Sequence, residues 1–352
     1  MMIIVKRNLF ATVACLAGLS STSASLAQEK IKVSVPSPAI TAFCMGIRMA
    51  RHPALPYAKK YDLTYEDVAM PIPQVPVNIS GNQVDIGECS GISTVLNAWN
   101  KGAKNMFVFA FGSELPVYQV VAAPQYKKLS DLKGKNIGIP GIQSAGAEAI
   151  EMSLKRGASL LPDRDYQYVT VGAGPATMAA LLANKIDAIP YFPPFTYELE
   201  KRGFPPLADV VTYVPQYVTG THVVSRQWAD KNRPQFIRFL KSLIETGEWL
   251  KDPANEKAVV AFFAEHIEPG GGQGKMDQPM AQKTYDFYVK DKRLSFNGYA
   301  PESAVRANVD ILKERGYMTD AEVPPLGQVF DFSYLNQALR ELGRPEVKEY
   351  AK

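Results

Sequence analysis

One group of residues with the composition of a binding loop lies between a short apolar strand and a helix. The group consists of Gln143, Ser144, Ala145 and Gly146. The first backbone N–H groups of a helix have no partner within it, so this loop could bind an anionic or carbonyl group of a ligand, with help from the serine hydroxyl. The alternative is an ordinary helix start at which Ser144 acts only as a cap.

Aromatic residues form a second group near predicted strand ends. They are Phe43, Tyr118, Tyr191, Phe192 and Phe195. Such rings could enclose a flat ligand, and Pro193 with Pro194 would stiffen the last loop into a preformed wall. The alternative assigns at least two of the five rings to the hydrophobic core.

Two acidic residues also follow predicted strands, and their position is unusual for carboxylates. Glu88 comes directly after the run Val-Asp-Ile-Gly, and Glu114 comes shortly after the apolar run 106–111. A carboxylate aimed into a cleft could hold an amine, a ring N–H or a hydroxyl group. An equally weighted alternative pairs Glu88 with Arg48 or Arg51. These acids and the aromatic rings favour an aromatic or nitrogen-containing ligand over a bare oxyanion.

Apart from Cys15, which lies in the apolar run near the N-terminus, the chain has two cysteines, Cys44 and Cys89. In an oxidising compartment they could form a disulfide, but two separate buried thiols are the favoured interpretation. Cys44 with His52 could also supply a nucleophile and a base, although no further cysteine–histidine–arginine pattern accompanies them.

The elements that must position these residues occur as two copies of one pattern. A strand ending in proline and a loop leading to a helix occur at 30–43 and again at 136–146. The phrase GNQVDIG at 81–87 is echoed by ANKIDAI at 183–189. The two pairs of phrases keep nearly the same spacing, which predicts two similar α/β lobes with a ligand cleft between them.

The N-terminus predicts export. Lys6 and Arg7 precede an apolar run from Leu9 to Leu19, and small residues then lead to a predicted mature start at Gln28. Residues 1–27 are therefore expected to be a cleavable signal peptide, and lipid anchoring through Cys15 stays open. A net charge of +4 without a basic cluster makes nucleic acid an unexpected partner.

Four phrases in order resemble the substrate-binding proteins of nitrate, sulfonate and taurine-type ABC importers, the SsuA/THI5-like or NMT1-like family. They are GNQVDIG at 81–87, LSDLKGKNIGIP at 129–140, ANKIDAI at 183–189 and FDFSYLNQAL at 330–339. The resemblance covers nearly all of the mature chain. It implies an α/β, two-lobed periplasmic-binding-protein fold of type II, with two hinge strands near Glu114–Val121 and Tyr217–Val223.

The resemblance also implies a division of the chain and a set of ligand contacts. Lobe 1 is expected to comprise residues 28–118 and 220–352, and lobe 2 residues 119–219. Ligand contacts are expected on the loops that end strands, at Ser37, Thr41, Phe43, Glu88, Ser90, Gly91, Glu114, Tyr118, Gln143, Ser144, Ala145, Gly146, Tyr191, Phe192 and Phe195.

The function predicted is that of a periplasmic solute receptor of an ABC importer. It would be a monomer without catalytic activity, metal or cofactor, and it would deliver a small solute to the permease subunits in the membrane. Two alternatives remain open. One is an enzyme on the same fold, a desulfinase dependent on Cys44, and the other is a ligand-sensing partner of a signalling receptor. The sequence does not identify the ligand or its affinity.

Overall fold

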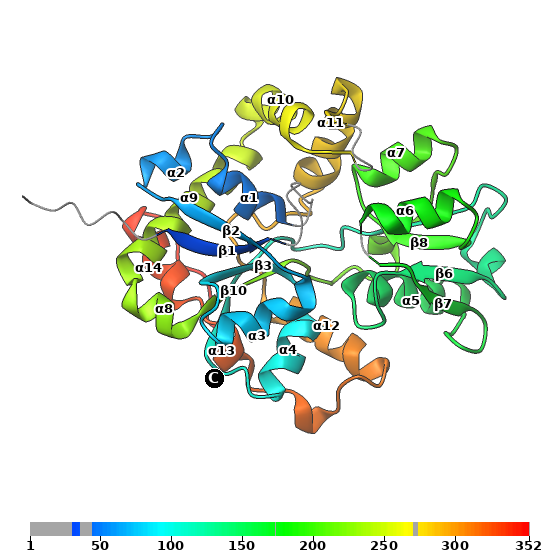
Figure 1. The fold of residues 1–352 in the computed structure, drawn as a ribbon, viewed down its shortest axis with the longest axis horizontal. Helices are drawn as coiled ribbons and strands as arrows, with labels where there is room; N and C mark the ends of the chain where they lie inside the picture. Colours follow the sequence, from blue (N-terminus) through cyan, green and yellow to red (C-terminus); the bar gives the residue numbers. More distant parts are fainter. Residues whose placement is uncertain (1–29, 36–43, 173, 270–273, 352) are drawn as a thin grey trace, which may run out of the picture.

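Two five-stranded β-sheets form the centres of the two lobes, one on each side of Figure 1. The computed structural model describes residues 30–35, 44–172, 174–269 and 274–351. Sheet 1 contains β1 (Ile31–Val35), β2 (Tyr65–Ala69), β3 (Ile86–Ser90), β4 (Met106–Phe111) and β10 (Thr221–Ser225). Sheet 2 contains β5 (Gln119–Ala122), β6 (Asn136–Ile139), β7 (Gln167–Thr170), β8 (Ala188–Tyr191) and β9 (Pro206–Asp209).

Helices pack against both sheets. Those of the first half are α1 (Met45–Arg51), α2 (Tyr57–Lys60), α3 (Val75–Ser80), α4 (Ile92–Asn100), α5 (Ala145–Ala158) and α6 (Pro175–Leu182). The second half contains α7 (Phe195–Lys201), α8 (Arg226–Lys231), α9 (Arg233–Lys251), α10 (Glu256–His266), α11 (Gln278–Tyr285), α12 (Glu302–Glu314), α13 (Leu326–Val329) and α14 (Ser333–Glu341). Within the described ranges, no helix is both long and apolar enough to cross a membrane.

The two sheets have equivalent strand orders. Sheet 1 runs β2-β1-β3-β10-β4, and sheet 2 runs β7-β6-β8-β5-β9. In each sheet the first three strands are parallel, and the fourth is antiparallel to both of its neighbours. That fourth strand, β10 or β5, is the one that enters its sheet directly after the chain has crossed from the other lobe. The repeated phrases in the sequence therefore correspond to two lobes of one design.

The echoed phrases have a structural cause that is the same in both lobes. Asn82 and Asn184 each have a positive φ, of 56° and 54°, a conformation that asparagine tolerates after a helix end. Asp85 then accepts a hydrogen bond from the backbone N–H of Lys32 at 2.8 Å, and Asp187 accepts one from Asn136 at 2.9 Å. Each aspartate thereby ties the start of one strand to its neighbour.

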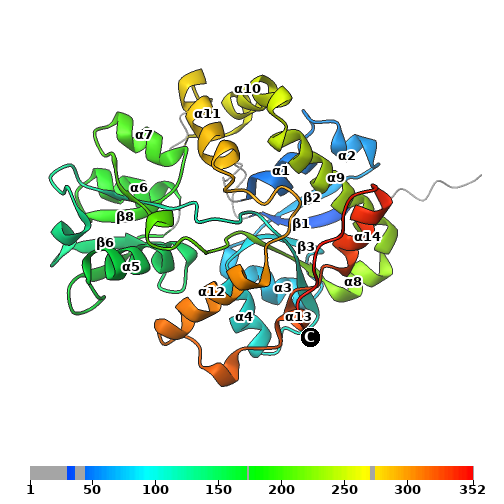
Figure 2. The same cartoon turned by 180° about the vertical axis from the view of Figure 1, so that it is seen from behind.

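Two segments, 112–118 and 210–220, connect the lobes, and a third segment lies against the first of them. The backbone N–H of Glu114 donates to the carbonyl of Arg293 at 2.9 Å, and Ser295 donates to Gly112 at 3.1 Å. Arg293 also donates two hydrogen bonds to the carboxylate of Asp209 in β9, at 3.0 and 2.7 Å. Figure 2 shows these connections from behind the view of Figure 1.

The buried side chains of lobe 2 continue into α10 and α11. One hydrophobic cluster includes Val120, Ile137 and Leu154 from lobe 2 together with Phe263 and Tyr285. The predicted lobe boundaries assign α10 and α11 to lobe 1. Those boundaries stay a prediction, since this cluster shows that side chains from both sides of them pack together.

Candidate functional site

Glu88 lies in the middle of β3, not after the strand as expected from the sequence, and it pairs with arginines of α1. Its side chain is fully buried, forms an ion pair with Arg48, and has a second guanidinium, that of Arg51, at 3.5 Å. Burial raises the pKa of the Glu88 carboxyl, while the two guanidinium groups oppose that shift. The arginine-paired alternative considered from the sequence is thus the arrangement found, and whether Glu88 also contacts a ligand stays a prediction.

Cys44 and Cys89 form a disulfide, so the expectation of two separate thiols is wrong. Their Cα atoms are 5.6 Å apart, within the usual range for a disulfide. The cause is tertiary: Cys89 lies in β3, and β3 pairs with β1, the strand that precedes Cys44 in the chain. His52 is not a partner of Cys44, because its ring lies against those of His266 and Phe262, at 4.4 and 5.1 Å between centroids.

The loop at the start of α5 packs against the end of β8 and against lobe 1. Ser144 caps the helix by accepting a hydrogen bond from the N–H of Ala147 at 3.2 Å. A Cβ added at Gly146 would lie 3.2 Å from Pro190 and 3.6 Å from Tyr118, so a glycine suits this close packing. Across the interface, the Ser93 hydroxyl donates to the carbonyl of Gln143 at 3.4 Å. Ser93 is the second residue of α4, so this contact brings the starts of α4 and α5 together.

Four of the five predicted aromatic residues form one cluster at the end of β8. Ring centroids are 5.7 Å apart for Tyr118 and Phe192, 5.4 Å for Tyr191 and Phe192, and 5.3 Å for Phe192 and Phe195. Tyr191 and Phe195 belong to the buried core beneath α6 and α7, whereas Phe192 is half-buried. Phe192 is therefore the most exposed ring of this cluster, and its contact with a ligand stays a prediction. Phe43 lies outside the described residues, as do Ser37 and Thr41.

Two buried hydroxyl groups near these strand ends have no hydrogen-bond partner among the described residues. They belong to Ser90, at the end of β3, and to Tyr191, at the end of β8. Gly91 follows Ser90 and precedes the first residue of α4. Buried polar atoms are rarely left unpaired, so hydroxyls of this kind commonly mark a place where water or a ligand binds.

Glu114 does not join these residues. It is exposed on the first connection between the lobes, where it borders a cavity of about 650 Å³. Lys251, Lys292 and Phe296 line the same cavity. Desolvation raises the pKa of the Glu114 carboxyl. Sequence reasoning placed Glu114 with Glu88 because both follow apolar runs, but in the fold Glu114 borders a different cavity.

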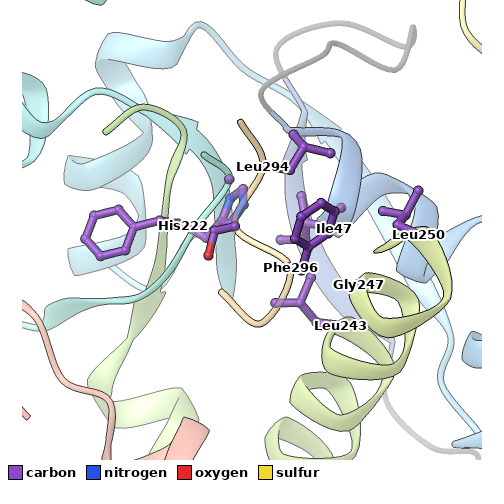
Figure 3. Close-up of a pocket in the computed structure, with 11 residues that line it drawn as sticks. Ile47, His222, Leu243, Gly247, Leu250, Leu294 and Phe296 are labelled. Carbon is purple, nitrogen blue, oxygen red and sulfur yellow. The ribbon is translucent and has the colours of Figure 1, made fainter. Parts of the chain in front are cut away.

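A second, much smaller cavity lies inside lobe 1 beside His222. Figure 3 shows side chains converging on it from β10, α1, α9 and the segment containing Leu294 and Phe296. Its volume of about 10 Å³ is comparable to that of one water, so it does not hold a solute. His222 is buried, its Nδ1 accepts a hydrogen bond from the N–H of Cys89 at 3.4 Å, and burial lowers its pKa to about 3.

Sequence reasoning missed a buried charge cluster between the lobes. Glu148 in α5 accepts a hydrogen bond from the hydroxyl of Tyr217 at 2.7 Å, and Arg315 approaches it from the end of α12. Burial raises the pKa of the Glu148 carboxyl, and the hydroxyls of Tyr217 and Ser93 oppose the shift. Among the described residues, no group of three or more histidine, cysteine, aspartate or glutamate side chains could hold a metal ion.

Comparison with known proteins agrees with this architecture. Residues 99–264 match the sequence model of the NMT1-like family. The ligand-binding component of an ABC-type import system from Staphylococcus aureus, solved with zinc bound, is 16% identical with a TM-score of 0.67, over 88% of this chain and 99% of that one. The periplasmic aliphatic sulphonate-binding protein SsuA from Escherichia coli is 17% identical with a TM-score of 0.61, over 86% and 92%.

A further similar structure is that of DszB. DszB, solved in complex with biphenyl-2-sulfinic acid, is 15% identical with a TM-score of 0.60, over 89% of this chain and 99% of that one. The search of curated proteins found no significant match.

The fold is therefore that of the periplasmic binding proteins, as the sequence predicted. The predicted resemblance to the NMT1-like family and to sulfonate-type binding proteins of ABC importers is also confirmed.

Proposed function

We propose that this chain is the extracytoplasmic solute-binding component of an ABC importer, which encloses a small organic solute between its lobes and delivers it to the permease. The observation that carries the proposal is the meeting of two helix starts from opposite lobes, joined by the hydrogen bond between Ser93 and Gln143. Ligands of open α/β sheets bind beyond the carboxyl ends of the strands, and these helices begin there. The similarity to solved binding components of import systems supports the same role.

An aromatic or nitrogen-containing solute suits this interface better than a bare oxyanion. Glu148 lies one turn into α5, and its buried carboxylate is already near the helix starts that would attract an anion. A second negative charge close to it would be repelled. The half-buried ring of Phe192 offers a stacking surface, and the unpaired hydroxyls of Ser90 and Tyr191 could exchange hydrogen bonds with ring nitrogens or hydroxyl groups.

The proposed location is the periplasm, reached through the signal peptide predicted at residues 1–27. The disulfide between Cys44 and Cys89 supports this location, because structural disulfides form and persist in oxidising compartments. The partners proposed are the solute and the permease subunits, with the protein acting as a monomer and without a cofactor.

We do not propose a desulfinase-like activity, although DszB has the same fold. Such a reaction would need a free thiolate at Cys44, since a thiolate is the nucleophilic form of cysteine. Cys44 is bonded to Cys89 and is fully buried. No observation favours catalysis over binding, so the enzyme stays the weaker alternative.

A thermal-shift screen of residues 28–352 tests the proposal. Small anions, sulfonates, aromatic acids and nitrogen heterocycles would be compared as additives. A bound solute at one hundred times its Kd stabilises the folded state by about 2.7 kcal/mol, which gives a clear rise in Tm. A rise with aromatic or heterocyclic solutes supports the proposal, a rise confined to small oxyanions overturns the solute class, and no rise in a broad panel counts against the receptor function.

A matched pair of variants then tests the site. Phe192→Ala should weaken binding at least tenfold while lowering the Tm of the unbound protein only slightly, since this ring is half-buried. Phe195→Ala removes a ring of the same size from the core and should lower the Tm strongly. If both variants lose stability equally and Phe192→Ala keeps its affinity, Phe192 is a core residue and not a ligand contact.

A further inference from the structure

A cluster of buried charges joins the two lobes beside the proposed ligand site. Arg315 follows α12, and its side chain is 1% exposed. Its Nε donates to the carboxylate of Glu151 at 2.9 Å, and its Nη1 lies 3.7 Å from that of Glu148. Both acids belong to α5 of lobe 2, whereas α12 packs on α4 of lobe 1. Figure 2 shows α12 lying between α4 and α5.

Further hydrogen bonds attach this cluster to the ligand loop and to a connection between the lobes. The third nitrogen of the Arg315 guanidinium, Nη2, donates to the carbonyl of Ile142, immediately before the loop that starts α5. Tyr217, on the second connection, donates to Glu148 at 2.7 Å, and Tyr168 donates to Glu151 at 3.0 Å. One guanidinium of lobe 1 therefore contacts the residue that precedes the loop and two carboxylates of lobe 2.

The cluster is sensitive to the distance between the lobes. If the lobes separated, water would solvate Arg315 and both carboxylates, whereas in the arrangement described here these groups depend on one another. Removing one partner of a buried ion pair leaves an uncompensated charge, which is strongly unfavourable, while removing both partners can be nearly neutral. Nη1 of Arg315 and Oε1 of Glu148 have no hydrogen bond in this arrangement, so the pair specifies a geometry more than it adds stability.

We propose that Arg315 is a positioning residue for lobe closure, which holds α5 and the ligand loop 143–146 against lobe 1 by pairing with Glu148 and Glu151. The link to solute capture rests on the function proposed above, but the effect on lobe closure does not. The same contact explains how a loop that binds a solute in lobe 2 can be kept at a fixed distance from lobe 1.

Spin labels on the two lobes test this role directly. Lys101 in lobe 1 and Lys185 in lobe 2 are exposed, and replacing both with cysteine provides labelling positions. The native cysteines of the described chain are bonded to each other and will not react. The distance distribution between the labels, measured by double electron–electron resonance, reports closure with or without a solute.

Arg315→Met should shift this distribution toward longer distances and raise the Kd of a solute from the screen at least tenfold. Adding Glu148→Gln and Glu151→Gln to Arg315→Met removes the uncompensated charges and should restore most of the closed population. Arg156→Met is the matched control, because Arg156 pairs across the same interface with Glu314 but its side chain is 39% exposed, compared with 1% for Arg315. It should leave both the distances and the Kd unchanged.

If Arg315→Met does not fold, Arg315→Lys can be used instead, because lysine keeps the charge but lacks the forked geometry. It should shift the distance distribution in the same direction by a smaller amount. Distances that stay unchanged in a folded Arg315 variant overturn the proposal. The proposal is also overturned if the two glutamine substitutions fail to restore the closed population that Arg315→Met loses. If the unaltered protein binds no solute but Arg315→Met still changes the distances, the receptor function fails while the role of Arg315 in closure stands.

Discussion

Replacing His222 with asparagine is expected to flatten the dependence of stability on pH below neutrality. The Nδ1 atom of His222 accepts a hydrogen bond from the N–H of Cys89 at 3.4 Å, so it must be unprotonated in the folded protein. A protonated ring would present a donor to a donor and would place a charge in a buried site. Asparagine can accept the same hydrogen bond through its side-chain oxygen and does not titrate.

The sign and the size of this change in stability follow from the pKa values of His222 in the folded and the unfolded chain. Burial lowers the pKa of His222 from its ordinary value of 6.5 to about 3 in the folded state. The unfolded chain therefore takes up a proton before the folded chain does, and stability present above pH 6.5 is lost as the pH falls toward 3. Between pH 8 and pH 5 this single group should lower the free energy of unfolding by about 2 kcal/mol.

Urea unfolding of the unaltered protein and of His222→Asn at a series of pH values measures this effect. The difference in unfolding free energy between the two proteins should change by that amount from pH 8 to pH 5, with unchanged m-values. His266→Asn controls for the loss of a half-buried imidazole as such. Parallel pH profiles for the unaltered protein and His222→Asn would refute the reasoning, because a histidine that titrates normally in the folded state contributes no such difference.

Two further predictions concern stability. The double variant Cys44→Ala/Cys89→Ala should be destabilised by about 4 kcal/mol, because the disulfide closes a separation of 45 residues, and the unaltered protein should lose a similar amount on reduction. A smaller loss in both denaturation experiments would show that the bond constrains the unfolded chain less than its loop length implies. Gly247→Ala should cost about 3 kcal/mol or more in urea midpoint experiments, because the added Cβ would lie 1.5 Å from the carbonyl oxygen of Phe296. Gly46→Ala meets only an ordinary contact at 3.9 Å, so a comparable loss there would contradict the steric argument.

Much of the fold could be predicted from the sequence because its signals are local. A strand that ends in proline, a small-residue loop and a periodic helix are properties of neighbouring residues. The echoed Asn–Asp phrases are equally local, since Asn82 and Asn184 adopt the conformation that follows a helix end and the next aspartates each tie a strand start. Repetition at a constant spacing then indicated two similar lobes, which the two sheets of equal strand order bear out.

The candidate site was only partly predictable, because its chemistry depends on partners that are distant in sequence. The sequence left open whether Glu88 is a free carboxylate in a cleft or pairs with Arg48 or Arg51, and only the fold shows α1 bringing Arg48 against it. The sequence favours a separate thiol at Cys44, but the pairing of β1 with β3 brings Cys44 to Cys89. No local sequence pattern marks Arg315 as a residue of the site.

What the sequence by itself determined is therefore the repeated α/β architecture and the loops at which strands end. The tertiary structure alone decided which buried charges are paired, which cysteine is bonded and which aromatic ring stays half-exposed. The physical reason is that hydrophobic periodicity acts along the chain, whereas desolvation and ion pairing depend on which segments the packed sheets bring together. Arg315 and Glu148, for example, are 3.7 Å apart in space although they are far apart in the sequence.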